Sequence, residues 1–101
     1  MVKELLSKAE FEEFIKDGIT LVDFYATWCG PCKMLAPNVE ELSNKGVKCG
    51  KMDIDSNVDL AMKYGIEVIP YVIVFKNGTP VDKSIGLVST QELEELINKN
   101  K

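Results

Sequence analysis

The chain has 101 residues, of which 46% are hydrophobic and 28% charged, with a formal net charge of −4. This length fits one globular domain over residues 1–101 and is too short for two. All twelve basic residues are lysines without a dense basic run, so we expect no nucleic-acid binding. The chain has no histidine, which removes that side chain as a general base, nucleophile or metal ligand.

No apolar stretch reaches the roughly 18 residues that a membrane-spanning helix needs. The segment Met1–Ser7 quickly becomes polar and lacks the apolar core of a signal peptide. We therefore expect a cytoplasmic protein that does not associate with membranes. Three cysteines are an odd number, and the cytosol keeps thiols reduced, so a purely structural disulfide framework is not expected.

The predicted elements alternate between strands and helices, beginning with a short edge strand over residues 2–5. Ser7 is the predicted N-cap of the first helix, with Glu10 reaching back to complete a capping box. Residues 19–25 form a near-continuous apolar run, which is typical of a buried central strand. This run contains a single charge, Asp23.

A second helix is predicted from about Cys29 to Ser43, with Pro37 inside it. Residues 47–54 are the next predicted strand. A short helix over residues 57–64 follows, and Gly65 is expected at the position just after its end, where a left-handed backbone is common.

Residues 71–75 are strand-like, and Asn77-Gly78 is a turn sequence that favours a hairpin with residues 81–85. Ser89 and Glu92 form a second capping box, which opens the last helix. Crossover helices imply parallel strands, whereas the hairpin adds an antiparallel edge. The sequence therefore predicts an α/β fold with a central mixed sheet of four to five strands flanked by four helices.

The segment with the clearest chemistry is Trp28-Cys29-Gly30-Pro31-Cys32, where the buried strand gives way to a helix. Residues three apart on a helix are neighbours, so the first turn can close a disulfide with little movement. Cys29 lies at the helix N-terminus, where free N–H groups and the helix dipole favour a thiolate, whereas Cys32 lies one turn inside. We therefore predict that Cys29 is the exposed, attacking thiol and that Cys32 resolves the mixed disulfide.

Other uses of the cysteines fit less well. A zinc site needs four ligands, and only Cys49 and carboxylates remain besides this pair, so no metal and no cofactor is expected. An inert structural disulfide does not fit a cytosolic chain. Cys49 is most simply a small buried hydrophobic residue, with a regulatory thiol as the alternative.

Residues 22–33 resemble the active-site segment of the thioredoxin family almost residue for residue. The resemblance covers the whole chain and includes Met34–Pro37, Lys51–Asp55, Tyr64–Ile66, Ile69-Pro70, Phe75–Gly78 and Gly86. It implies a thioredoxin fold and a monomeric protein-disulfide reductant. Such a protein cycles between dithiol and disulfide, is re-reduced by a thioredoxin reductase, and acts on disulfide-containing client proteins.

The resemblance also implies roles for two charged residues. Asp23 matches a buried acid behind the second cysteine that helps to deprotonate it through water, and Lys51 matches the lysine that approaches this acid. A solvent-facing Asp23 and an exposed strand Lys51 are the alternatives. If Asp23 is buried, we expect desolvation to raise its pKa more than Lys51 lowers it.

A docking surface for substrate is implied by further matches. Trp28 matches the tryptophan that flanks this surface, although alone it could be a core residue. Ile69-Pro70 matches a cis peptide that packs against the cysteines and exposes the Ile69 backbone, with an ordinary edge-strand Pro70 as the alternative. The predicted substrate-binding set is Trp28, Gly30, Pro31, Ile69, Pro70 and Gly86.

Two positions depart from the family pattern. Tyr71 stands where threonine usually follows the proline, and Val68 stands where glycine or another small residue is common. Both are expected near the docking groove, where they would affect partner choice rather than chemistry. An oxidase or isomerase of the same fold and a non-redox binding module are the rival functions. Gly30-Pro31 and the absence of a signal peptide argue against the oxidase or isomerase, and the binding module stays open as an alternative.

Overall fold

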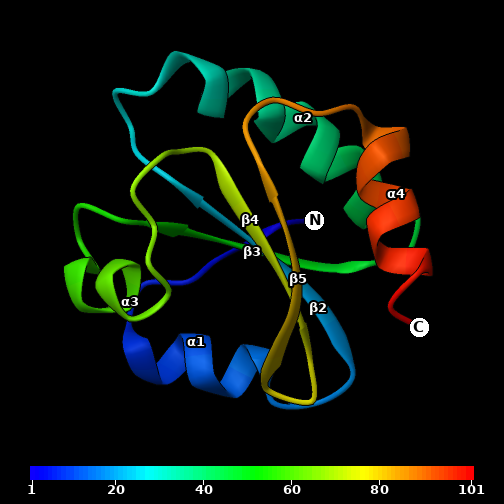
Figure 1. Cartoon of the computed structure of the whole chain (residues 1–101), viewed down its shortest axis with the longest axis horizontal. Coiled ribbons are helices and arrows are strands. Elements are labelled where there is room, and N and C mark those ends of the chain that lie inside the picture. The colour runs from blue at the N-terminus through cyan, green and yellow to red at the C-terminus, as the bar shows by residue number, and fades with distance from the viewer.

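The computed structural model describes residues 1–101, and its elements follow the predicted order (Figure 1). No helix is both long enough and apolar enough to cross a membrane. The strands are β1 (Lys3–Glu4), β2 (Ile19–Tyr25), β3 (Lys48–Asp53), β4 (Tyr71–Lys76) and β5 (Thr79–Ile85). The helices are α1 (Lys8–Ile15), α2 (Gly30–Asn44), α3 (Val58–Lys63) and α4 (Thr90–Asn98).

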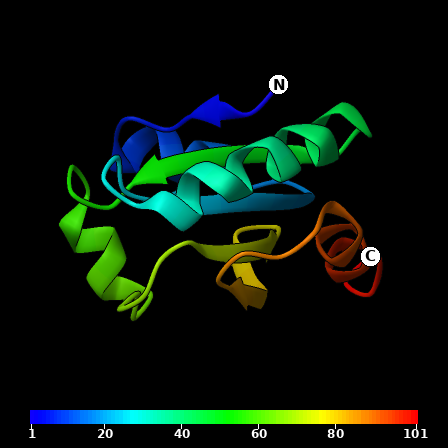
Figure 2. The same ribbon diagram turned by 90° about the horizontal axis from the view of Figure 1, so that it is seen from above.

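The five strands form one mixed sheet in the order β1-β3-β2-β4-β5. β1 and β2 pair with β3 in parallel, whereas β4 pairs antiparallel with both β2 and β5. Figure 2 shows β1 at one edge of the sheet and the β4–β5 hairpin at the other. β2 is therefore central, with strands on both sides, which explains its near-continuous apolar sequence.

Side chains alternate along each strand and divide the core into two clusters. The face covered by α1 and α3 is rich in aromatic residues; its buried members include Phe11, Phe24, Leu60 and Phe75. The face covered by α2 and α4 is aliphatic; its buried members include Leu21, Leu35, Val74, Leu93 and Ile97. Because Leu21 and Asp23 are two residues apart on β2, Asp23 points towards the α2 face.

The N-terminal cap of the first helix differs from the predicted capping box in one hydrogen bond. Ser7 accepts a hydrogen bond from the Glu10 N–H at 3.1 Å, but the Glu10 carboxylate accepts from the Leu6 N–H at 3.2 Å rather than from Ser7. The chain before α1 thus places Leu6 within reach of the carboxylate. At α4 the capping box between Ser89 and Glu92 is complete, as predicted.

The hairpin turn is confirmed, with φ of 51° at Asn77 and 85° at Gly78. Positive φ at both central residues is the turn type that suits a two-residue hairpin. β5 begins at Thr79, two residues before the predicted start, and includes Pro80. A proline is tolerated there because β5 is an edge strand, and the register shifts opposite it between Val74 and Phe75.

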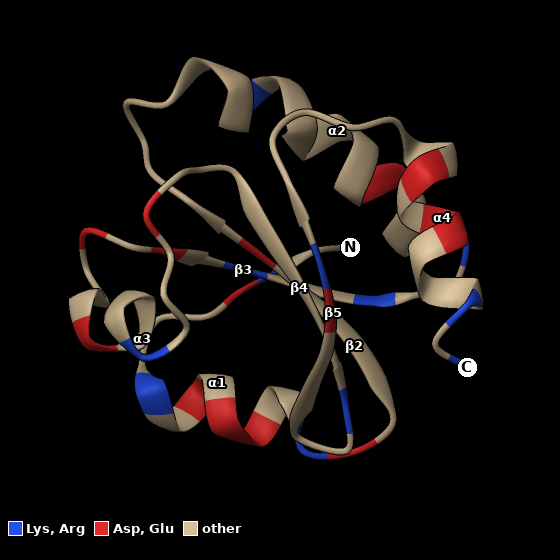
Figure 3. Ribbon diagram, viewed as in Figure 1, with Lys and Arg blue, Asp and Glu red and all other residues tan.

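Acidic and basic positions both occur on α1 and α3, and the acidic α4 is followed by lysines at the C-terminus (Figure 3). Charge of neither sign is confined to one side of the fold. The one buried charged residue is Asp23 on the central strand β2, and it adjoins the site described below.

Gly50 on β3 is needed by the packing of its neighbours. A Cβ at this position would lie 2.9 Å from Leu5 Cδ1 and 2.9 Å from Phe14 Cε2, and both neighbours are buried. We expect Gly50→Ala to lower the free energy of unfolding by about 1–3 kcal/mol, measured by urea unfolding. Gly30→Ala is the control, because a Cβ there meets nothing within 4 Å. Equal stability of Gly50→Ala and wild type would contradict this account.

Candidate active site

The cysteine pair lies where β2 leads into α2. Cys29 is the N-cap of α2, and its Sγ accepts a hydrogen bond from the Cys32 N–H at 3.2 Å. The two Cα atoms are 5.3 Å apart, and the two Sγ atoms form a disulfide. The first helical turn therefore brings the sulfurs together as the spacing predicts, and it aims a free amide N–H at Cys29, which favours a thiolate when the pair is reduced.

The prediction that Cys29 is the exposed member of the pair is wrong for the disulfide form. Cys29 is 5% exposed and Cys32 is 3% exposed, so exposure hardly separates them. The reason is that Cys29 packs with Ala26 and Cys32 in a small buried cluster, with Ile69 against it. The two cysteines differ in their place on the helix rather than in accessibility.

The Ile69–Pro70 peptide bond is cis, as the resemblance implies. The Ile69 carbonyl oxygen lies 4.0 Å from Cys29 Sγ, so the backbone before β4 adjoins the redox pair. Gly86 contacts this cis peptide, because its N–H donates to the Pro70 carbonyl at 2.9 Å. Its φ is 90°, a left-handed conformation that favours glycine. The fold thus places residues far apart in the sequence next to the disulfide.

The rim of the site is exposed and partly apolar. Trp28 is 68% exposed, which excludes a core role, and its Nε1 donates to Asp55 Oδ2 at 2.8 Å. Val68 next to Ile69 and Leu87 next to Gly86 are also exposed hydrophobic residues. Isolated exposed hydrophobic residues are common, but these three are each next in sequence to a residue of the site, namely Cys29, Ile69 or Gly86. Gly30 and Pro31 are exposed as well, in the first turn of α2.

Asp23 is a buried acid behind the redox pair. It is 3% exposed, which excludes the solvent-facing alternative, and its Oδ1 has no hydrogen-bond partner within the protein. Asp23, Cys32, Lys33 and Lys51 all line a cavity of about 330 Å³. Burial raises the pKa of Asp23 to about 7, Lys51 lowers it, and the charge of Glu4 raises it further. The expectation that burial outweighs Lys51 is confirmed.

Lys51 is brought to Asp23 by strand pairing but does not form an ion pair with it. Asp23 and Lys51 are partners in the register of β2 and β3. The Lys51 Nζ instead lies 3.8 Å from Glu4 Oε1. Glu4 was not identified from the sequence. The predicted strand over residues 2–5 was the only signal, and it did not indicate that β1 pairs with β3.

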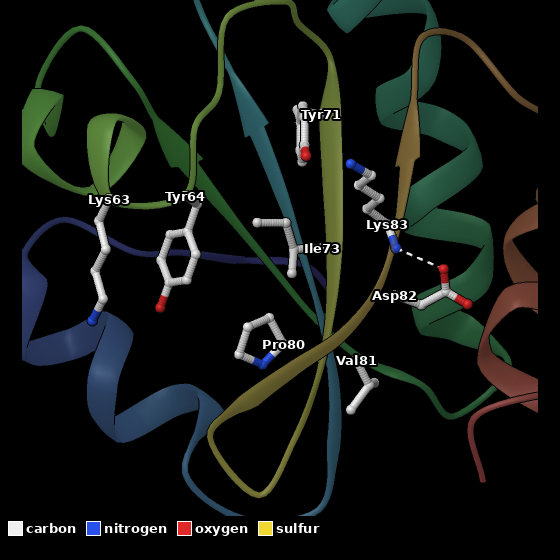
Figure 4. Close-up of a pocket in the computed structure, with 8 residues that line it drawn as sticks. All are labelled: Lys63, Tyr64, Tyr71, Ile73, Pro80, Val81, Asp82 and Lys83. Carbon is white, nitrogen blue, oxygen red and sulfur yellow. Dashed lines mark hydrogen bonds between the residues drawn. The ribbon is translucent and has the colours of Figure 1, made fainter.

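The expectation that Tyr71 lies in the docking groove is wrong. Tyr71 is 7% exposed and packs in the aromatic cluster on the α1 and α3 face. It lines a cavity of about 490 Å³ together with Tyr64, Ile73 and Pro80 (Figure 4). The physical reason is strand alternation, since the first residue of β4 points to the same face as Ile73. Of the two departures from the family pattern, only Val68 stays exposed.

Cys49 is a small buried hydrophobic residue in this structure. It is buried on β3 in the aliphatic cluster under α2 and α4. Burial raises the pKa of the Cys49 thiol to about 12. A thiol with this pKa is almost entirely protonated near neutral pH, so Cys49 has little of the thiolate that reacts.

Three comparisons with known proteins indicate the same family over nearly the whole chain. The family model for thioredoxin matches residues 2–99. Thioredoxin from Staphylococcus aureus strain N315 is 44% identical over 98 residues, which cover 94% of each chain. The structure of Fasciola hepatica thioredoxin is 35% identical with a TM-score of 0.89, covering 99% of this chain and 100% of that one. Oxidised Plasmodium falciparum thioredoxin is 37% identical with a TM-score of 0.87, covering 99% and 98%.

A cysteine pair at a helix N-terminus beside a cis-proline defines the class of protein. It is a thiol–disulfide oxidoreductase whose dithiol/disulfide redox centre is Cys29 and Cys32. The chain belongs to the thioredoxin family, and its five-stranded mixed sheet with four helices is the thioredoxin fold.

The raised pKa of Asp23 makes stability depend on pH. The folded chain keeps the Asp23 proton up to about pH 7, whereas the unfolded chain releases it near the ordinary pKa of about 3.9. Stability due to this group is therefore greatest below about pH 4 and is lost by about pH 7, a change of about 4 kcal/mol. We expect Asp23→Asn to be more stable than wild type near pH 8 and similar near pH 4, measured by urea unfolding of the oxidised proteins.

The exposed Asp17 provides the control, because Asp17→Asn changes the same charge at the surface. Its stability should follow that of wild type at every pH. A stability difference between Asp23→Asn and wild type that does not vary with pH would contradict the account.

Proposed function

We propose that this protein reduces disulfides in client proteins in the cytoplasm and is itself re-reduced by a thioredoxin reductase. It acts as a single-domain monomer without a bound cofactor. The observation that carries the proposal is Cys29 at the N-cap of α2, with the Cys32 N–H on its sulfur and the Ile69 carbonyl beside it. Membership of the thioredoxin family supports the two kinds of partner.

In the first step, the Cys29 thiolate attacks one sulfur of a client disulfide. A bond forms between Cys29 and that sulfur, and the other client sulfur leaves as a thiolate that takes a proton from water. The client docks on the surface made by Trp28, Gly30, Pro31, Ile69, Pro70 and Gly86. The exposed Trp28 ring and the Ile69 backbone support this assignment, because both border Cys29.

In the second step, Cys32 releases the client. The Cys32 thiol gives its proton to the Asp23 carboxylate through water in the cavity that both residues line. The Cys32 thiolate then attacks Cys29 Sγ, the client leaves as a second thiolate, and the Cys29–Cys32 disulfide forms. Two electrons have passed to the client, and the reductase returns two. An acid with a pKa of about 7 suits this transfer, because both its forms are populated near neutral pH.

The direction of electron flow separates this proposal from an oxidase or isomerase. Thioredoxins have reduction potentials of about −270 mV, whereas an isomerase lies near −180 mV and a strong oxidase near −120 mV. Equilibration of the Cys29–Cys32 pair with glutathione buffers measures this potential, and a value close to either of the latter would reject the reductant. A double variant, Cys29→Ser with Cys32→Ser, that kept full function would instead point to a binding module.

The roles of the two cysteines differ in a trapping experiment. Reduced Cys32→Ser should accumulate a mixed disulfide with insulin, because nothing resolves it, whereas reduced Cys29→Ser should form at least tenfold less. Cys49→Ser is the matched control and should turn over insulin like wild type. Non-reducing electrophoresis and mass spectrometry identify the adducts. More adduct on Cys32 than on Cys29 would reverse the assignment.

Val68 and Tyr71 should respond differently to substitution. Val68→Ser removes an exposed apolar side chain next to Ile69, so it should change the rate with insulin and leave reduction of a small aromatic disulfide nearly unchanged. Tyr71→Thr removes a buried ring and should lower the free energy of unfolding by about 2–4 kcal/mol. Equal effects of Val68→Ser on both disulfides would argue against a docking role for Val68.

A further inference from the structure

Three charged residues form one row across three strands. Glu4 on β1 is the register partner of Lys51 on β3, and Lys51 is the register partner of Asp23 on β2. Leu5, the residue after Glu4, packs in the cluster on the α1 and α3 face, so Glu4 points to the opposite face, as Asp23 does. Lys51 therefore stands between two acids on the same face of the sheet.

The Lys51 ammonium is paired with the acid at the sheet edge. Its Nζ lies 3.8 Å from Glu4 Oε1, and it forms no ion pair with Asp23. The Tyr25 hydroxyl donates to the Glu4 carboxylate, at 2.8 Å from Oε1 and 2.9 Å from Oε2. Lys51 Nζ also lies 5.7 Å from the centre of the Tyr25 ring. Glu4 and Tyr25 thus provide two contacts for the ammonium, and Glu4 lies on the side of β3 away from Asp23.

The surroundings of the two acids explain why Lys51 pairs with Glu4 rather than with Asp23. The Glu4 side chain is 36% exposed and the Lys51 side chain 41%, so their pairing leaves both groups partly hydrated. Asp23 is 3% exposed, and a contact with it would draw the ammonium under α2. Burying a charge costs free energy unless it is paired and fully hydrogen-bonded.

We propose that Glu4, held by the Tyr25 hydroxyl, is a positioning residue that draws the Lys51 ammonium away from the Asp23 carboxyl. Glu4 thereby sets how readily Asp23 exchanges a proton with Cys32. This inference rests on the proposed acid–base function of Asp23, and it adds a residue that touches neither the client nor the sulfurs.

The charged and titratable groups that face Asp23 come from four elements. They are Glu4 on β1, Tyr25 on β2, Lys51 on β3, and Cys32, Lys33 and Glu40 on α2. Among the charged groups, Lys51 lowers the pKa of Asp23 and Glu4 raises it. Removing the Glu4 charge should lower the pKa of Asp23 in two ways. It removes the repulsion between the two carboxylates, and it frees Lys51 to approach Asp23.

The test is the titration of the Asp23 carboxyl by carbon-13 NMR in wild type and variants. The oxidised protein is used because Cys32 does not titrate in the disulfide. We expect Glu4→Gln to move the pKa of Asp23 about one pH unit lower. Tyr25→Phe should lower the pKa of Asp23 by a smaller amount. In this variant Glu4 keeps its charge but loses the hydrogen bond from the Tyr25 hydroxyl. Glu41→Gln, the same change at an exposed site on α2, should leave it unchanged.

The second readout is the pH profile of client release from a preformed mixed disulfide on Cys29. In Glu4→Gln the inflection of this profile should move to lower pH together with the Asp23 titration, and Glu4→Asp should restore it in part. An unchanged Asp23 titration in Glu4→Gln overturns the inference. Failure of Asp23→Asn to alter client release would instead reject the acid–base function, and the two failures are therefore distinguishable.

Discussion

The redox chemistry proposed for this protein depends on a carboxyl group that is buried in the central strand. Asp23 has neighbours on both sides of β2 and lies beneath α2, so burial raises its pKa to about 7. The same strand ends at the turn that starts α2 and thereby places Cys32 at the cavity that Asp23 lines. One strand therefore fixes both the sulfur and the group proposed to take its proton.

Much of the fold follows from local sequence. The Asn77-Gly78 turn and the Ser89 cap depend on interactions within a few residues, and the structure contains both. The spacing of Cys29 and Cys32 likewise determines their geometry, because one helical turn sets the separation of their Cα atoms. The cis Ile69–Pro70 bond could be predicted only from the resemblance to the thioredoxin family, since most bonds before proline are trans.

What local sequence did not predict depends on the pairing of distant segments. The sequence predicts β1 as a short edge strand, but two residues are too few to indicate its partner, which follows from the assembled sheet. The contact between Glu4 and Lys51 exists only in that register. Tyr71 illustrates the same limit: its nearness to Pro70 in sequence suggests the groove, but alternation along β4 turns its side chain into the aromatic cluster.

The surface proposed for docking and the groups proposed for proton transfer lie in different parts of the molecule. The exposed rim comes from the loops that follow β2, precede β4 and follow β5, at Trp28, Val68 and Leu87 respectively. The charged row comes from paired strands, where each backbone position is held by its neighbours. Loops tolerate substitution better than paired strands do. Under the proposed function, partner preference can therefore change at the rim while the strands preserve the environment of Asp23, so that the same chemistry serves different clients.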